Sequence, residues 1–134
     1  MKNLLTSLSL TILLAAAPLQ FAGAQSVPPF VKKLYPEQAQ TLGWQEDLAI
    51  SDPDGALDAK SKQLIGLAVA AQIPCQYCVY FHTKAAKAAG ATDAQIKEAI
   101  ATAALTRKWS TVLNGSAYDF DTFKRETDGM FASN

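Results

Sequence analysis

The chain has 134 residues, with 12 Lys or Arg against 12 Asp or Glu, two cysteines and one histidine. This length suits one small domain with a modest core. Because the charges balance and no basic tail or patch stands out, we expect no nucleic-acid partner.

The N-terminal segment 1–24 is predicted to be a secretory signal peptide. A short basic start at Lys2 precedes an apolar run over 4–17, and the small residues 22–24 suit cleavage by signal peptidase. The run is too short for a good membrane span. We therefore expect a single mature domain, 25–134, in the periplasm or outside the cell, with no membrane attachment after cleavage.

The mature chain is predicted to be all-α, because no stretch alternates between apolar and polar residues at a period of two. We expect a compact domain of about five helices. A short helical turn at 31–35 comes first and a frayed tail at 128–134 comes last. Between them, the first helix starts at Pro36-Glu37, the second runs from Asp58 to about Gln72, and the third follows Pro74 and stops near Gly90. The fourth runs from Thr92 to about Leu113, and the fifth spans 116–126.

Local signals set the predicted helix ends. Asp58 is a typical N-cap residue, and Thr92 with Gln95 has the form of a capping box. Gly90 is a good stop signal. Within the Asp58 helix, Gly66 and several alanines are small, which lets another helix approach closely.

Every cysteine and the histidine lie within eight residues, in the segment Cys75-Gln76-Tyr77-Cys78-Val79-Tyr80-Phe81-His82. On a helix, offsets of 0, 3 and 7 place Cys75, Cys78 and His82 on one face. We expect both sulfurs in the first turn, where unpaired N–H groups and the helix dipole favour a thiolate. The rings of Tyr77, Tyr80 and Phe81 are expected to shield the site.

Other chemistries fit this segment poorly. Haem attachment needs a histidine directly after the second cysteine, where this chain has Val79. A structural zinc site needs four ligands and only three are present. We therefore expect neither a metal nor a cofactor. Inert packing of small side chains is the simpler alternative, but the clustering of all Cys and His on one face favours reactive thiol chemistry.

Two physical arguments differ on which sulfur attacks a substrate. The helix dipole favours Cys75, which is nearer the helix start. The i,i+4 spacing favours Cys78, because His82 lies one turn away as a base. A specific base outweighs a dipole effect of about 0.3–1 kcal/mol, so we prefer Cys78.

Residues 58–99, with Cys-x-x-Cys-x-x-x-His at the centre and Ala-Ala-Gly-Ala-Thr-Asp after it, resemble the alkylhydroperoxidase D-like branch of the carboxymuconolactone decarboxylase family. The resemblance implies an all-helical domain that assembles as a homo-oligomer, typically a trimer or hexamer. It also implies a cysteine-based peroxidase or disulfide reductase, in which Cys78 attacks peroxide, Cys75 resolves the product and His82 belongs to a proton relay.

The sequence departs from this family at two positions. The family relay normally has a glutamate twelve residues before the first cysteine, and this chain has Gln63 there. A glutamine can orient His82 or a water by hydrogen bonds, but it cannot accept a proton near neutral pH. Tyr77 stands where the family often has a histidine.

We therefore expect an exported, thiol-dependent antioxidant protein that reduces peroxides or exchanges disulfides. The substitution at Gln63 keeps an alternative open, which is a non-catalytic oligomeric binding or scaffold protein with a structural disulfide. The lipoamide-type partners that the resemblance suggests are cytoplasmic, so the expected reductant is an envelope dithiol carrier. Isomerase or decarboxylase chemistry is a third interpretation, for which no acid–base pair is visible.

Overall fold

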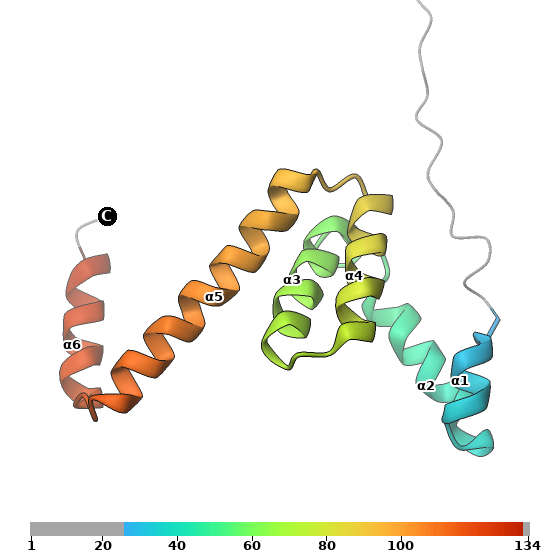
Figure 1. Ribbon diagram of the computed structural model, residues 1–134, viewed down its shortest axis with the longest axis horizontal. Coiled ribbons are helices and arrows are strands. Elements are labelled where there is room, and N and C mark those ends of the chain that lie inside the picture. Colours follow the sequence, from blue (N-terminus) through green and yellow to red (C-terminus); the bar gives the residue numbers. More distant parts are fainter. Residues whose placement is uncertain (1–25, 133–134) are drawn as a thin grey trace, which may run out of the picture. The chain divides into compact units, whose positions relative to one another are not determined.

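A computed structural model describes residues 26–132. The predicted signal peptide and its cleavage point lie outside the described residues. The described part contains six helices and no strand (Figure 1). They are α1 (Pro29–Leu34), α2 (Glu37–Ile50), α3 (Ala59–Gln72), α4 (Gln76–Ala88), α5 (Asp93–Gly115) and α6 (Phe120–Phe131). The all-α prediction is confirmed. The helix beyond the five that were expected is α1, which forms where the sequence predicts a short helical turn at 31–35.

The chain divides into two compact units, with the boundary inside α2 between Gln45 and Glu46. In the N-terminal unit, the Gln40 side chain joins α2 to α1. Its Nε2 donates to the carbonyl oxygens of Lys32 at 3.1 Å and Tyr35 at 3.0 Å. These bonds occupy carbonyl groups at the end of α1 that the helix itself leaves without partners.

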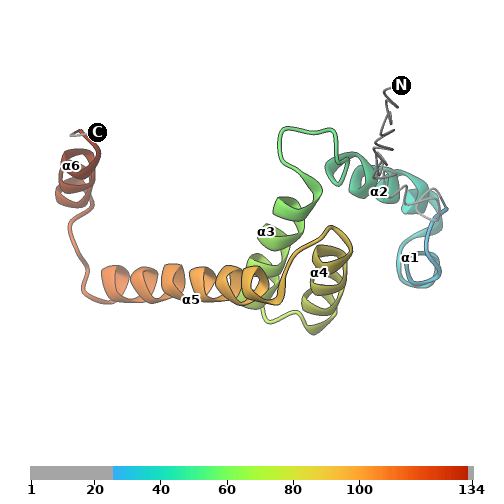
Figure 2. The ribbon, with the colours of Figure 1, turned by 90° about the horizontal axis from the view of Figure 1, so that it is seen from above.

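In the C-terminal unit, α3 packs against both α4 and α5 (Figure 2). The core between them is small and consists of Leu67, Ala86, Ala91 and Ile96, with Leu64 and Val79 packed against it. Ala86 and Ala91 have short side chains, so the helix backbones approach closely around Leu67. This core fixes α4, and therefore the cysteine segment, against α3.

Three predicted helix ends are confirmed. Asp58 Oδ1 accepts from the Ser61 N–H at 2.9 Å as the N-cap of α3. Thr92 and Gln95 form both bonds of a capping box, at 3.2 Å and 3.0 Å. Gly90 follows α4 with φ of +83°, a left-handed conformation that glycine adopts without steric cost.

The prediction for the last helix is wrong at both ends. Ser116 is the C-cap of α5 instead of the start of a new helix. The next helix begins after Asp119, whose Oδ1 accepts from the Thr122 N–H at 2.8 Å. An Asp N-cap with this bond satisfies a first-turn donor, and the helix then continues to Phe131 through most of the predicted frayed tail.

Among residues 26–132, no helix combines the length and the hydropathy needed to cross a bilayer.

Candidate redox site

Cys75 and Cys78 form a disulfide, with their Cα atoms 5.3 Å apart. Cys75 is the N-cap of α4 and has an extended backbone, so only Cys78 lies in the first turn. The expectation that both sulfurs lie within the helix is therefore wrong for Cys75. The reason is a capping bond, because the Cys75 Sγ accepts from the Cys78 N–H at 3.2 Å.

The N-cap position gives the Cys75 sulfur a direct electrostatic role. The first N–H groups of a helix have no partner within the helix, and one of them points at this sulfur. In the reduced protein the same N–H would stabilise a Cys75 thiolate, together with a dipole effect of about 0.3–1 kcal/mol. Cys75 and Cys78 are both half-buried, so exposure does not distinguish them.

His82 lies one turn after Cys78 on α4, and its ring reaches α3. Its Nδ1 is 2.8 Å from Oε1 of Gln63, which is nineteen residues earlier in the chain. Burial of the half-buried ring lowers the pKa of His82, which favours the neutral imidazole. The structure thus brings Gln63 into contact with His82, the two residues that the family resemblance places at relay positions.

Gly66 belongs to the same contact, although the sequence identifies it only as a small residue. A Cβ added at Gly66 would lie 2.4, 2.6 and 2.8 Å from Cε1, Nδ1 and Nε2 of His82. The imidazole therefore lies directly against the backbone of α3. A glycine inside a helix is the sequence signal of a close packing contact, but it does not show which side chain packs there.

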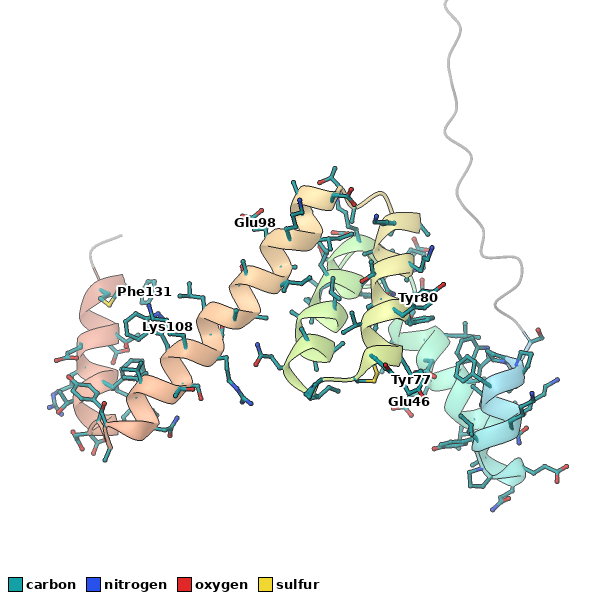
Figure 3. All side chains as sticks on the ribbon, in the orientation of Figure 1. Glu46, Tyr77, Tyr80, Glu98, Lys108 and Phe131 are labelled. Atoms are coloured by element: carbon teal, nitrogen blue, oxygen red, sulfur yellow. A yellow bond between two sulfur atoms is a disulfide. The ribbon has the colours of Figure 1, made fainter. Side chains whose placement is uncertain are left out.

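The three aromatic side chains of α4 are all exposed to solvent to a large extent. Tyr77 is 79% exposed and Tyr80 is 69% exposed (Figure 3). Phe81 contacts the histidine, with ring centroids 5.2 Å apart in an edge-to-face arrangement. Shielding of the cysteines by the two tyrosines stays a prediction.

An open groove of about 570 Å³ lies beside the start of α4. Its lining is mostly apolar and consists of Ala71, Pro74, Gln76, Val79, Tyr80, Thr83 and Lys84. Pro74 and Gln76 flank Cys75, so the groove begins next to the disulfide. Among the described residues, no group of three or more His, Cys, Asp or Glu side chains is placed to hold a metal ion.

A sequence profile of the carboxymuconolactone decarboxylase family matches residues 37–118, which include the disulfide, Gln63 and His82. The chain belongs to this family. Within the family, a solved structure places it in the alkylhydroperoxidase D-like branch. That structure is the alkylhydroperoxidase AhpD core from Rhodospirillum rubrum, with a TM-score of 0.64, 28% identity and 72% coverage of each chain.

A curated protein also resembles the chain. It is "Uncharacterized protein 4 in cox locus" from Paracoccus denitrificans, 52% identical over 54 residues. The match covers 40% of this chain and 49% of the relative. The chain thus spans about half the length of the curated relative that it matches.

Proposed function

We propose that this protein is an exported thiol-dependent antioxidant protein that reduces peroxides or exchanges disulfides through Cys75 and Cys78. The observation that carries this proposal is the disulfide at the start of α4, with His82 one turn further on and bound to Gln63. Membership of the alkylhydroperoxidase D-like branch supports the same chemistry.

The proposed cycle begins with the reduced pair. His82 takes the proton of the Cys78 thiol, and the thiolate attacks a peroxide, ROOH. The O–O bond breaks, which leaves a sulfenic acid on Cys78, and the departing alkoxide takes the proton back from His82 and leaves as the alcohol ROH. The Cys75 thiol then attacks this sulfur, releases water and forms the disulfide. A dithiol donor returns two electrons by exchange through a mixed disulfide.

Peroxide consumption with a synthetic dithiol tests this cycle. The mature wild type should consume peroxide in proportion to the added dithiol, and Cys78→Ser should abolish consumption because the attacking sulfur is lost. Cys75→Ser is the matched control, because it keeps Cys78 but cannot close the disulfide. That variant should accumulate a sulfenic acid that a dimedone-type reagent labels. Unchanged consumption by Cys78→Ser would overturn the assignment.

A second function is favoured by Gln63 itself. Its amide holds His82 at 2.8 Å but cannot accept a proton near neutral pH. In a scaffold protein, the disulfide would stay oxidised and the reduced thiols would react with peroxide no faster than a model thiol. Stopped-flow oxidation combined with a redox titration separates the two functions, because a rapid thiol reaction rejects the scaffold.

The proposed location is the periplasm or the cell exterior, with an envelope dithiol carrier as the reductant. The predicted signal peptide over 1–24 motivates both parts of this proposal. Mass spectrometry of the protein recovered from the cell envelope checks the location, because the mature chain should begin at Gln25. Recovery of an uncleaved chain from the cytoplasm would contradict it.

Assembly as a homo-oligomer, a trimer or hexamer, is part of the same proposal. The described residues bury few apolar side chains, and most of those are alanines. Large apolar side chains remain exposed on α3, and others lie on α5. Exposed apolar patches on a protein surface mark interaction sites. In a symmetric oligomer, another copy of the chain would cover it.

A further inference from the structure

His82 is held by two residues of α3 in different ways. Gln63 forms a hydrogen bond with Nδ1 of the ring. Gly66 has no side chain, and this leaves room for the ring close to the helix backbone. The ring therefore has one polar partner on α3 and fills the space that a side chain at position 66 would occupy.

We propose that Gly66 is a positioning residue of the redox site, which seats the His82 ring on α3 so that Gln63 holds its proton on Nδ1. The role of this geometry in catalysis rests on the proposed function, whereas the geometry itself does not.

The chemistry of the Gln63–His82 bond decides the tautomer. In the structure the amide oxygen of Gln63, which is an acceptor only, faces Nδ1 at 2.8 Å, and in this orientation the imidazole nitrogen carries the hydrogen. A neutral imidazole has one N–H and one lone pair. The lone pair is therefore on Nε2, which becomes the ring position that can take a proton from a thiol.

The surroundings keep the imidazole neutral. An amide oxygen has no full charge, so it does not stabilise an imidazolium as a carboxylate would. Burial favours the neutral ring, and no charged side chain contributes to its lowered pKa. Lys62, the cation next to Gln63 in the chain, donates its Nζ hydrogen to the carbonyl oxygen of Asp52 instead.

The requirement for glycine at position 66 is steric. The three ring atoms would lie within 2.8 Å of a Cβ at this position, closer than side chains tolerate. The ring would have to move away from α3, and its bond to Gln63 would be lost. The tautomer would then be set by solvent.

The ¹⁵N NMR spectrum of the imidazole tests the proposal directly. His82 is the only histidine of the chain, so its two ring nitrogens can be observed in uniformly labelled oxidised protein without ambiguity. At about pH 8, above the ordinary imidazole pKa of about 6.5, Nδ1 should show a pyrrole-type shift and Nε2 a pyridine-type shift. In Gly66→Ala, the pyrrole-type shift at Nδ1 should be lost, and both nitrogens should approach the values of a free imidazole.

Gly129→Ala is the matched control, because Gly129 also lies inside a helix and a Cβ there would meet nothing within 4 Å. Its imidazole spectrum should equal that of the wild type. If Gly66→Ala does not fold, Gln63→Leu is the second test variant. This substitution removes the hydrogen-bond acceptor of Nδ1 without adding a side chain at position 66. It should also lose the pyrrole-type shift at Nδ1.

A pyridine-type Nδ1 in the wild type would overturn the proposal, as would an unchanged spectrum in Gly66→Ala or Gln63→Leu. This measurement needs no peroxide and no reductant. A protein without peroxidase activity but with the Nδ1–H tautomer would therefore contradict the proposed function and leave this inference intact.

Discussion

The contact between Gln63 and His82 joins α3 to α4 through two side chains, with Nδ1 of His82 2.8 Å from Oε1 of Gln63. The amide makes this contact without a negative charge and without the capacity to accept a proton. In the proposed cycle, the base that serves the cysteine pair therefore has a neutral partner.

Replacement of this amide tests its effect on turnover. Gln63→Glu should raise the pKa of His82, because an adjacent carboxylate favours the imidazolium, and it should supply the missing proton acceptor. We expect dithiol-dependent peroxide turnover to rise by about 10²-fold, the lower end of general acid–base effects. Steady-state assays should compare it with Gln63→Leu, which should not exceed the wild type. Equal rates for Gln63→Glu and the wild type would show that proton acceptance at this position is not limiting.

The lowered pKa of His82 also predicts how stability depends on pH. The unfolded chain takes up a proton at the ordinary imidazole pKa of about 6.5, whereas the buried ring takes it up only at lower pH. Stability is therefore complete above about pH 6.5 and falls as the pH drops through that value. Urea midpoints measured at one protein concentration, at about pH 8 and pH 5.5, should show this loss in the wild type.

His82→Asn provides the control for this pH dependence, because its side chain does not titrate. Its midpoint should change less over the same interval. Asp58, Asp93 and Asp119 have pKa values lowered from 3.8 by hydrogen bonds and an ion pair, so they stay ionised in this interval. The same pH dependence in both proteins would mean that burial of His82 is not its source.

Among single residues, the sequence predicts the cysteine pair, His82 and, through the family resemblance, Gln63. The contact of Gly66 with His82 is not predictable in this way. Which side chain lies over a glycine depends on the angle and rotation with which α4 crosses α3, and these follow from packing around Leu67. The exposure of Tyr77 and Tyr80 has the same origin, because a helical pattern does not show which face another helix covers.

At the scale of helices, local capping groups account for most of the observed boundaries. Asp58 and the pair Thr92 and Gln95 satisfy N–H groups that the helices leave without partners. The start of α6 was predicted too early because Ser116 and Asp119 are both suitable N-caps. The backbone carbonyls of α5 decide between them, since the Ser116 N–H donates to Val112 and keeps this residue on α5.

The capping box of α5 gives a stability prediction. Thr92→Ala removes the hydroxyl that accepts from the Gln95 N–H at 3.2 Å and should lower the free energy of unfolding by about 1 kcal/mol. Thr106→Ala makes the same chemical change inside α5, where alanine is the better helix former, so stability should stay the same or rise. Chemical denaturation measures both. Equal losses in the two variants would contradict a specific capping role.

At the scale of the whole molecule, the family fold is present but its core is thin. The C-terminal unit buries Leu67 among small residues, whereas apolar side chains on the later part of α5 remain in solvent. Leu105, Trp109 and Val112 follow one another at helical spacing, with exposed fractions of 52%, 50% and 45%. They form a stripe along one face of the helix, which is the pattern of an interface.

This stripe predicts the effect of a charge on assembly. Trp109→Glu should convert the proposed homo-oligomer to smaller species, because a buried and unpaired carboxylate is costly in an interface. Arg107→Glu introduces the same side chain at another exposed position of α5 and should leave the mass unchanged. Light scattering after size exclusion measures both masses. A wild-type monomer, or equal dissociation in the two variants, would contradict assembly through this stripe.

The capping bond of Cys75 has a consequence for the speed of the proposed cycle. A Cys75 thiolate at the same position would accept from the Cys78 N–H as the disulfide sulfur does, so the start of α4 would keep its acceptor in both redox states. In the proposed cycle, no helix then has to unwind between turnovers. Turnover should therefore rise with the concentration of oxidant or donor instead of levelling off at the rate of a conformational step.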